Sequence, residues 1–243
     1  MEAGQITLPS GKTATLAATH TLTAANDSTI KVVPVTAPKP VILFIGGAGD
    51  QQSYYFQGAF HNINYAAEQL LAPLDQRFSK GAYVVRVMGY NDSKGESDIQ
   101  KNIKAFIPTK SSPIYIVGHS LGGWNGAHLS TILADEGYNV QMLVTLDPVG
   151  EGFWVWVGSD IYKSKPAPVA KIWINIRANP SQPDTSDSVA NFGERWTVTS
   201  GPSINTSVNL NHAVAWAMFV APIQGGQSAR DLMLDAITRN LQR

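Results

Sequence analysis

The chain has 243 residues, with 18 Lys and Arg against 18 Asp and Glu, so its formal net charge is zero. A neutral chain with 15% charged residues lacks the basic excess with which nucleic-acid-binding proteins neutralise phosphates, so no nucleic-acid partner is expected. At 44% hydrophobic residues it can fill a packed core, and without cysteine it has neither disulfides nor a thiolate nucleophile.

Strand-like and helix-like segments alternate from about residue 40 onward, which is typical of a parallel sheet covered by helices. Apolar runs predict strands at 41–45, 82–88, 114–117, 141–146, 170–176 and 195–199. Helical spacing predicts helices at 59–73, 97–106, 122–134 and 228–241. Thr-rich, β-branched runs between residues 5 and 37 predict antiparallel hairpins at a sheet edge. We therefore expect an α/β fold with a mostly parallel central sheet, helices on both faces and an antiparallel N-terminal edge.

Three irregular segments interrupt this alternation. Residues 51–60 and 148–168 carry aromatic side chains, and each follows the carboxyl end of a predicted strand. Residues 179–193 are polar and rich in Pro, Ser and Asp, which predicts an exposed loop. No stretch approaches about 18 apolar residues and no signal peptide is visible at the start. We expect a soluble protein, either cytoplasmic or exported by a signal-independent route.

The pentapeptide at residues 118–122 reads Gly-His-Ser-Leu-Gly and matches the G-x-S-x-G pattern of a nucleophile elbow. It follows the apolar run at 114–117 and opens the predicted helix at 122–134, as the strand-to-helix turn of an elbow requires. Flanking glycines leave room for a strained serine backbone, whose hydroxyl then projects at the carboxyl edge of the sheet. The pattern predicts Ser120 as a nucleophile; the alternative is an ordinary glycine turn with a capping serine.

A serine hydroxyl is a poor nucleophile unless a base takes its proton, so we look for a histidine. Two histidines follow Ser120 in the chain. His128 falls within the predicted helix behind the elbow and points away from the strand tips, so we expect it to be a surface or packing residue. His212 lies in the loop after the last predicted strand and before an apolar helix. That position predicts His212 as the base.

The base in turn needs a carboxylate that orients its ring. Asp147 directly follows a predicted strand, so its side chain leaves the sheet at the same edge as Ser120. Asp184, or Asp187, lies in the polar segment after the next strand. We prefer Asp147 because a rigid strand end is better preorganised than a polar loop. Asp184 stays as the alternative acid, because Asp147 could instead form an Asx turn before the following proline.

Two backbone N–H groups aimed at one point can stabilise the oxyanion that forms during acyl transfer. One belongs to the residue after the nucleophile, here Leu121. The other is expected in the glycine loop at 46–49, where we name Gly47, with Ala48 as the neighbour that could serve instead. This loop matches neither G-x-G-x-x-G nor the P-loop pattern, so it does not predict a nucleotide site.

The sequence resembles the α/β-hydrolase superfamily from about residue 30 onward, because it has a strand, a glycine loop, the elbow and the chain order Ser120, Asp147, His212. Within that superfamily it resembles lipases and esterases, including lipase-like hydrolases of bacteria. The resemblance implies hydrolysis of a carboxylic ester or phospholipid acyl ester through an acyl-Ser120 intermediate. In pancreatic-type lipases the acid follows the same strand as Asp147, whereas in most other hydrolases of the fold it lies one strand later, at Asp184. Ile45 departs from many lipases, which have His before the oxyanion glycine. The alternatives are a thioesterase, a secreted phospholipase effector and a non-catalytic binding protein of this fold.

Aromatic side chains near the expected site could bind an acyl group or close over it as a lid, and the alternative is that they pack long loops onto the body. The residues are Tyr54, Tyr55, Phe56, Trp124, Phe153, Trp154 and Trp156. Because the catalytic set spans Gly47 to His212, we expect one domain over 1–243, with 148–168 as a lid or cap insertion. We expect no cofactor or metal, a small-molecule or lipid ester as partner, and transient membrane-surface contact through the aromatic loops. The sequence leaves the oligomeric state and the physiological ester open.

Overall fold

The computed structural model describes residues 37–51 and 61–242, together with four short strands before residue 37. These four strands pair antiparallel, β1 with β2 and β3 with β4, as predicted. Each pair is a two-stranded sheet of its own and is not an edge of the central sheet, whose outer strands are β10 and β6. Strands joined by short connections pair with each other because closing a short loop costs little entropy. Their bounds are Gly4–Thr7 (β1), Thr13–Leu16 (β2), His20–Thr23 (β3) and Thr29–Val32 (β4).

Within the described residues, the central sheet has six parallel strands in the order β10-β9-β8-β7-β5-β6. Along β5, Ile42 and Phe44 pack into one hydrophobic core, while Val41, Leu43 and Ile45 pack into another on the opposite face. Burial of both faces explains why the inner strands are continuous apolar runs, and the predicted α/β fold is confirmed. The bounds are Val41–Gly46 (β5), Val84–Gly89 (β6), Ile114–His119 (β7), Val140–Leu146 (β8), Ile172–Ala178 (β9) and Ile204–Val208 (β10).

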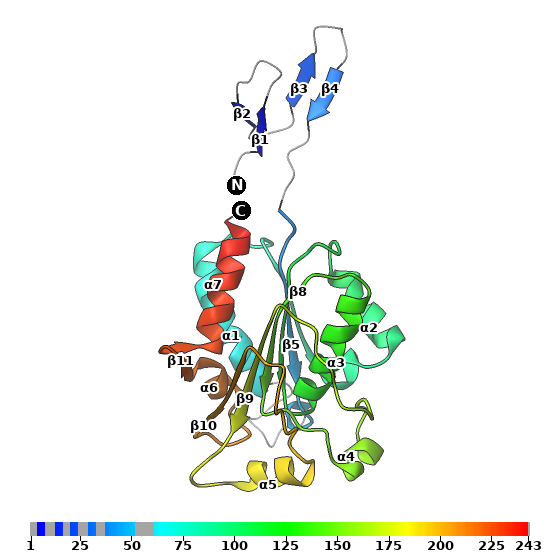
Figure 1. The fold of residues 1–243 in the computed structure, drawn as a ribbon, viewed down its shortest axis with the longest axis vertical. Helices are drawn as coiled ribbons and strands as arrows, with labels where there is room; N and C mark the ends of the chain where they lie inside the picture. The colour runs from blue at the N-terminus through cyan, green and yellow to red at the C-terminus, as the bar shows by residue number, and fades with distance from the viewer. Residues whose placement is uncertain are drawn as a thin grey trace.

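Helices cover both faces of this sheet (Figure 1). Helices α1, α6 and α7 lie on one face, α2 and α3 lie on the other, and the short helices α4 and α5 lie at the edge where the strands end. No described helix is both long and apolar enough to cross a membrane. The bounds are His61–Arg77 (α1), Glu96–Asn102 (α2), Leu121–Asp135 (α3), Phe153–Gly158 (α4), Thr185–Phe192 (α5), Ala215–Val220 (α6) and Ala229–Leu241 (α7). Short 3-10 turns occupy Gly49–Gln51, Asn91–Ser93 and Lys104–Phe106, and a small hairpin joins β11 (Pro222–Gln224) to β12 (Gln227–Ser228).

The last strand of the sheet is not at the predicted position. Residues 195–199 form no strand; Arg195 makes an isolated antiparallel bridge with Val149. The outer strand is β10, which alternates half-buried and exposed side chains as an edge strand does. It therefore lacks the continuous apolar run by which the inner strands are recognised.

The polar segment at 179–193 contains a helix, α5, where a loop was expected. The side chain of Asp184 accepts from the backbone of Asp187 while the side chain of Asp187 accepts from the backbone of Asp184, a reciprocal capping box that starts the helix. The predicted helix at 97–106 is also divided, because Ile103 has a non-helical φ of −124° between α2 and the 3-10 turn that follows.

The strand order reverses between β5 and β7. Strand β6 lies outside β5, whereas β7 and every later strand of the sheet are added on the opposite side of β5. In parallel α/β sheets, ligands bind in the crevice beyond the carboxyl ends of the strands at such a switch point. The glycine loop after β5 and the turn at Ser120 after β7 both leave the sheet there. The topology thus brings these two segments to one place.

Candidate active site

Ser120 occupies the sharp turn between β7 and α3. Its φ of 56° and ψ of −124° cost a non-glycine residue free energy and persist only where the surroundings enforce them. The flanking glycines permit the close packing of this turn. A Cβ on Gly118 would lie 2.3 Å from the carbonyl oxygen of Gly122, and one on Gly122 would lie 2.3 Å from that of Ile45. The elbow geometry therefore requires glycine at both positions.

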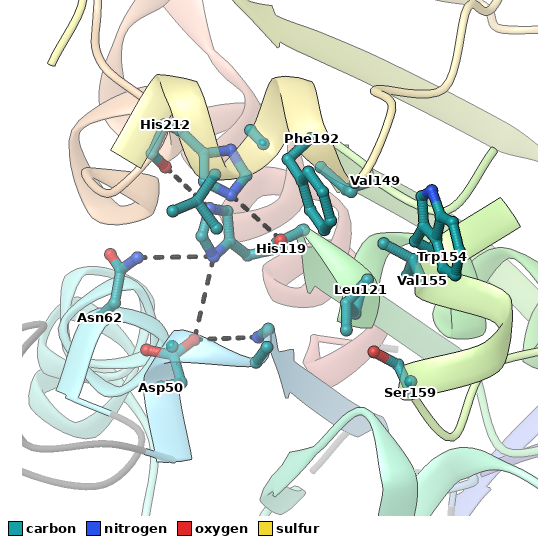
Figure 2. Close-up of a pocket in the computed structure, with 18 residues that line it drawn as sticks. Asp50, Asn62, His119, Leu121, Val149, Trp154, Val155, Ser159, Phe192 and His212 are labelled. Atoms are coloured by element: carbon teal, nitrogen blue, oxygen red, sulfur yellow. Dashed lines mark hydrogen bonds and ion pairs between the residues drawn. The ribbon is translucent and has the colours of Figure 1, made fainter. Parts of the chain in front are cut away.

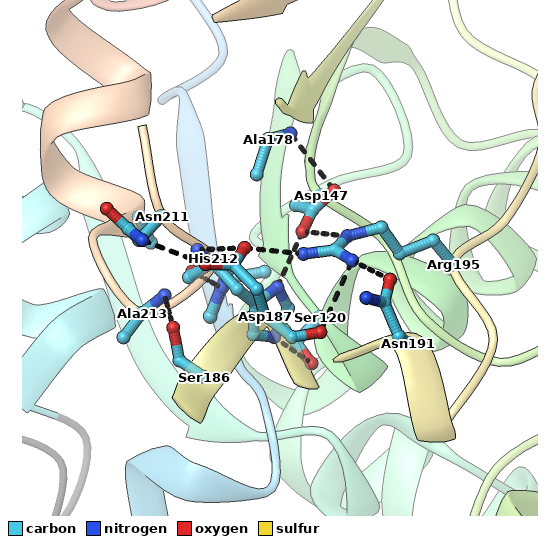
Figure 3. A network of polar contacts seen from close by, with 12 residues as sticks. Ser120, Asp147, Ala178, Ser186, Asp187, Asn191, Arg195, Asn211, His212 and Ala213 are labelled. Carbon is cyan, nitrogen blue, oxygen red and sulfur yellow. Dashed lines mark hydrogen bonds and ion pairs between the residues drawn. The ribbon is translucent and has the colours of Figure 1, made fainter. Parts of the chain in front are cut away.

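The side chains of three separate segments meet at this turn (Figure 3). Nε2 of His212, in the loop between β10 and α6, accepts from the hydroxyl of Ser120 at 3.0 Å, and its Nδ1 donates to Oδ2 of Asp147 at 2.7 Å. A carboxylate can only accept here, and this fixes which ring nitrogen carries the proton. Asp147 follows β8 with a left-handed φ of 42°, and its Oδ1 accepts from the N–H of Ala178 at 3.0 Å. The structure brings together the three residues that the sequence pointed to.

Burial and neighbouring charges set the protonation of this pair. Burial is the strongest influence on the pKa of His212 and lowers it; Asp147 acts in the opposite direction, while His119 and Arg195 add to the lowering. Burial raises the pKa of Asp147, but the hydrogen bonds and charges of His212 and Arg195 outweigh it and hold that pKa below its usual value. A neutral imidazole therefore faces an ionised carboxylate at neutral pH, the state in which the ring can accept a proton.

Asp184, the alternative acid, caps helix α5. Its carboxylate accepts from the backbone N–H groups of Ser186 at 2.8 Å and Asp187 at 3.3 Å, which makes it the N-cap of α5. It is Asp187 that contacts His212, since its Oδ1 accepts from the backbone N–H of His212 at 3.1 Å. Asp184 therefore orients a helix, and Asp147 orients the imidazole.

Arg195 contacts the acid candidate and was not predicted from the sequence. Its Nε donates to Oδ2 of Asp147 at 2.8 Å, and its Nη2 donates to Oδ1 of Asp187 at 2.7 Å (Figure 3). No sequence pattern points to this arginine, because it lies 48 residues after its partner. A signal for Asp187 was present in the spacing of Asp184 and Asp187, which is that of a helix-capping pair.

His119, between the first glycine and the serine of the elbow, contacts His212 from another side (Figure 2). Its Nε2 donates to the carbonyl oxygen of His212 at 2.8 Å, and the two ring centroids are 4.7 Å apart. Its Nδ1 lies 3.4 Å from Nδ2 of Asn62 and 3.8 Å from Oδ2 of Asp50. Oδ1 of Asn62 accepts from the N–H of Ala215 at 2.9 Å, so the amide nitrogen must face the histidine.

The glycine loop after β5 differs from expectation at Gly47. The N–H of Gly47 donates to Oδ2 of Asp50 at 3.1 Å, so in this arrangement it is not free to bind an oxyanion. Glycine is needed there for another reason: a Cβ would lie 2.6 Å from the Cβ of Ser120. Ala48 and Leu121 both line the pocket, and Leu121 is the first residue of α3, where N–H groups have no acceptor within the helix. Their amides are the better oxyanion candidates.

Ser120 is among the residues that line a pocket of about 300 Å³. Figure 2 shows this pocket with His119 and His212 on it. Asp50, Asn62 and His119 form one side, and their polar atoms are engaged with other protein groups. No Lys or Arg is among the described residues that line the pocket. The other side is apolar and is formed by Leu121, Val149, Trp154, Val155, Val189, Ala190 and Phe192.

The expected aromatic residues are only partly at the pocket. Trp154 on α4 lines it, and so does Phe192 on α5, which was not predicted because the segment was read as a polar loop. Phe153 packs edge-on against Trp154, with ring centroids 5.4 Å apart, but does not line the pocket. All three rings are about two-thirds exposed, at 62 to 68%. The predicted Tyr54, Tyr55 and Phe56 lie outside the described residues.

Two of the predicted tryptophans have a structural role. Trp124 is fully buried against Trp196, and its Nε1 donates to the carbonyl oxygen of Tyr162 at 2.8 Å. Trp156 packs against the same core, and its Nε1 donates to the carbonyl oxygen of Gly150 at 2.5 Å. Neither tryptophan is among the described residues that line the pocket, which differs from their prediction as substrate-binding residues.

The segment at 148–168, expected to form a lid, is held on both sides of α4. Before α4, the N–H of Val149 donates to the carbonyl oxygen of Ser120 at 3.1 Å. After α4, side chains of α3 donate to backbone carbonyls of the segment, His128 to Ser164 at 2.8 Å among them. Trp124, Asn125 and Thr131 do the same. These contacts anchor the segment on both sides of α4, and a lid at 148–168 stays a prediction.

The chain is similar to three solved structures at low sequence identity. YbtT, a type II thioesterase from a yersiniabactin biosynthetic pathway, has a TM-score of 0.40 at 10% identity, over 85% of this chain and 94% of that one. The esterase domain of a Rhodothermus marinus protein has a TM-score of 0.41 at 11% identity, over 91% and 97% of the two chains. A bacterial heroin esterase has a TM-score of 0.39 at 13% identity, over 92% and 84%. No protein-family model and no curated protein matches the sequence.

Proposed function

We propose that this protein is a serine ester hydrolase that acts through an acyl-Ser120 intermediate. The observation that carries the proposal is the pair of contacts, 3.0 Å and 2.7 Å long, that joins Ser120, His212 and Asp147 beside an open pocket. The three residues come from turns that follow different strands, so a local motif does not explain their meeting. A hydrogen-bonded nucleophile, base and acid are the groups that activate a serine.

In the proposed reaction, Nε2 of His212 takes the hydroxyl proton as Ser120 attacks the ester carbonyl. Asp147 stabilises the imidazolium, which then protonates the leaving alcohol. The amides of Leu121 and Ala48 hold the oxyanion, for which backbone N–H groups at a helix start are suited. Water then attacks the acyl-serine by the same steps and releases the acid.

The pocket favours an uncharged, apolar acyl group. Its apolar side is made by α4 and α5, including Trp154 and Phe192, whereas the polar side chains opposite are engaged within the protein. Without a free cation among its described lining residues, the pocket has no group that would bind a carboxylate or phosphate next to the scissile bond. We therefore propose carboxylic esters of medium or long acyl chains as substrates.

Exposed apolar side chains lie on the two helices that form the apolar side of this pocket. They are Phe153, Trp154 and Val157 on α4, and Val189 and Phe192 on α5. An apolar surface of this kind fits substrates held in a lipid surface, and with zero net charge the contact would depend on apolar burial. Phospholipid acyl esters are the form of substrate that would use both the pocket and these exposed side chains.

Hydrolysis of p-nitrophenyl esters tests the proposal. Wild type should cleave them, with kcat/KM rising from acetate toward medium chains, and Ser120→Ala should lower kcat by roughly a millionfold. Ser188→Ala, which changes an exposed serine on α5, serves as the control and should behave as wild type. Folded wild type with no hydrolysis above Ser120→Ala would contradict the proposal and favour a binding protein.

A further inference from the structure

A guanidinium group joins two carboxylates next to the base. The side chain of Arg195 is 8% exposed and contacts Asp147 at 2.8 Å and Asp187 at 2.7 Å, and those carboxylates are 0% and 3% exposed. A third nitrogen, Nη1, donates to the side-chain oxygen of Asn191. The rigid, planar fork of an arginine fixes the positions of groups that it bridges, which a flexible lysine does not.

These contacts form a closed ring that begins and ends at His212. Its imidazole donates to Asp147, whose same oxygen accepts from Arg195. Arg195 also donates to Asp187, whose same oxygen accepts from the backbone N–H of His212 at 3.1 Å. The other oxygen of Asp187 accepts from Nδ2 of Asn211 at 2.9 Å. One network of contacts therefore holds both the imidazole and the backbone of His212.

The backbone before Arg195 is strained in the same way as that of the nucleophile and the acid. In the part of the chain that the structure describes, three non-glycine residues have positive φ: Ser120 at 56°, Asp147 at 42° and Glu194 at 55°. The carbonyl oxygen of Glu194 accepts from the N–H groups of Gly150 and Glu151, which holds the turn. Such strain persists where surrounding contacts enforce it.

We propose that Arg195 and Asp187 are a positioning pair for the general base, holding the imidazole and the backbone of His212 in register with Ser120. The inference rests on the proposed function, because a base needs such placement only if it acts on the serine. It adds two residues that do not touch the substrate and that act through His212 and Asp147.

The two members of the pair should move the titration of His212 in opposite directions. In the described part of the chain, the charged and titratable groups that contact His212 or its partner Asp147 are Asp147 itself, Arg195, Asp187 and His119. Removing the positive charge of Arg195 leaves Asp147 unopposed, which raises the pKa of His212. Removing the negative charge of Asp187 leaves Arg195 less compensated, which lowers that pKa.

The test combines kinetics with an NMR titration of the His212 ring. Arg195→Met should lower kcat on a p-nitrophenyl ester by about 10- to 100-fold, with KM changed much less, since an aligning contact to a charged group is lost. The acidic limb of the pH profile of kcat/KM, which reports the pKa of His212, should move to higher pH in Arg195→Met and to lower pH in Asp187→Asn. Arg195→Lys should keep the wild-type limb and still lose rate. Arg239→Met, an exposed arginine on α7, is the matched control and should match wild type.

Opposite shifts in the two variants support the positioning pair. The positioning pair would be overturned if both variants lost kcat equally while the acidic limb of the pH profile stayed at its wild-type position. It would also be overturned if the limb moved in the same direction in both variants. The ring titration needs no turnover, so opposite NMR shifts in a protein without esterase activity would overturn the proposed function and keep the network. If Arg195→Met does not fold, Arg195→Lys and Asp187→Asn decide: a wild-type rate in both would refute the inference.

Discussion

Replacing Asp147 by Asn tests the assignment of the acid. All three partners of this carboxylate donate to it: His212 and Arg195 to Oδ2, and the N–H of Ala178 to Oδ1. An asparagine has one acceptor oxygen, so its amide nitrogen must face a donor in either orientation. With the nitrogen toward His212, the ring must give up its proton on Nδ1 and carry it on Nε2, where it can no longer accept from Ser120.

The expected loss follows from this wrong tautomer. A triad of this geometry loses about 10⁴-fold in kcat when its acid becomes an amide, which at 1.36 kcal/mol per tenfold is about 5.4 kcal/mol of transition-state stabilisation. If the nitrogen turns toward Ala178 instead, the His212 contact survives, and a buried N–H loses its acceptor at a cost of about 1–3 kcal/mol in folding free energy. With the nitrogen toward His212, Nε of Arg195 loses its acceptor as well, so stability falls in both orientations and kcat reports which one the asparagine takes.

The assay measures kcat on a p-nitrophenyl ester and the free energy of unfolding by urea for Asp147→Asn and Asp184→Asn. Asp184→Asn is the matched control, because Asn is also a good N-cap and should keep α5 and the activity. A folded Asp147→Asn variant within tenfold of wild type in kcat and unchanged in stability would show that Asp147 is not the acid. A loss confined to Asp184→Asn would assign the acid to that residue.

Three further outcomes follow from the site. Burial lowers the pKa of His212, and only the neutral ring accepts a proton. We therefore expect kcat/KM to fall as the pH drops through a midpoint below about 6.5. A midpoint above that value would contradict the lowering of this pKa by burial. Trp154→Ala and Phe192→Ala should each lower kcat/KM about fivefold on esters of long acyl chains, which is about 1 kcal/mol, and change it little on acetate esters. Phe153→Ala should lower activity only on lipid vesicles. Equal effects of Trp154→Ala and Phe192→Ala on acetate esters would refute the acyl pocket. Gly122→Ala places a Cβ against two backbone carbonyls and should lower stability by about 1–3 kcal/mol in thermal unfolding, whereas Gly158→Ala, with open space around it, should not.

The residues that can be predicted from the sequence are those whose position follows from one rigid strand. Ser120 and Asp147 directly follow β7 and β8, so the apolar run before each one places it at the carboxyl edge. His212 is found by chain order, since it lies between the last strand and an apolar helix even though the predicted last strand was misplaced. Strand β10 was missed because an edge strand alternates in burial and resembles a loop in composition.

What the sequence does not provide is the direction of side chains and amides. The N–H of Gly47 is in the expected loop but is directed at Asp50, a contact that depends on the local turn and not on residue type. Trp124 follows the elbow closely, yet the helix turns its ring into the core. Arg195 becomes visible only when a parallel sheet brings a loop 48 residues distant next to Asp147.

Labelling with a fluorophosphonate probe measures the activation of Ser120 itself, because the probe reacts with an activated serine and needs no knowledge of the substrate. At neutral pH the wild-type protein should be labelled, with the adduct located on Ser120 by mass spectrometry. Labelling should be lost in Ser120→Ala and strongly slowed in His212→Gln. A folded wild-type protein that stays unlabelled, or an adduct on another residue, would contradict the account.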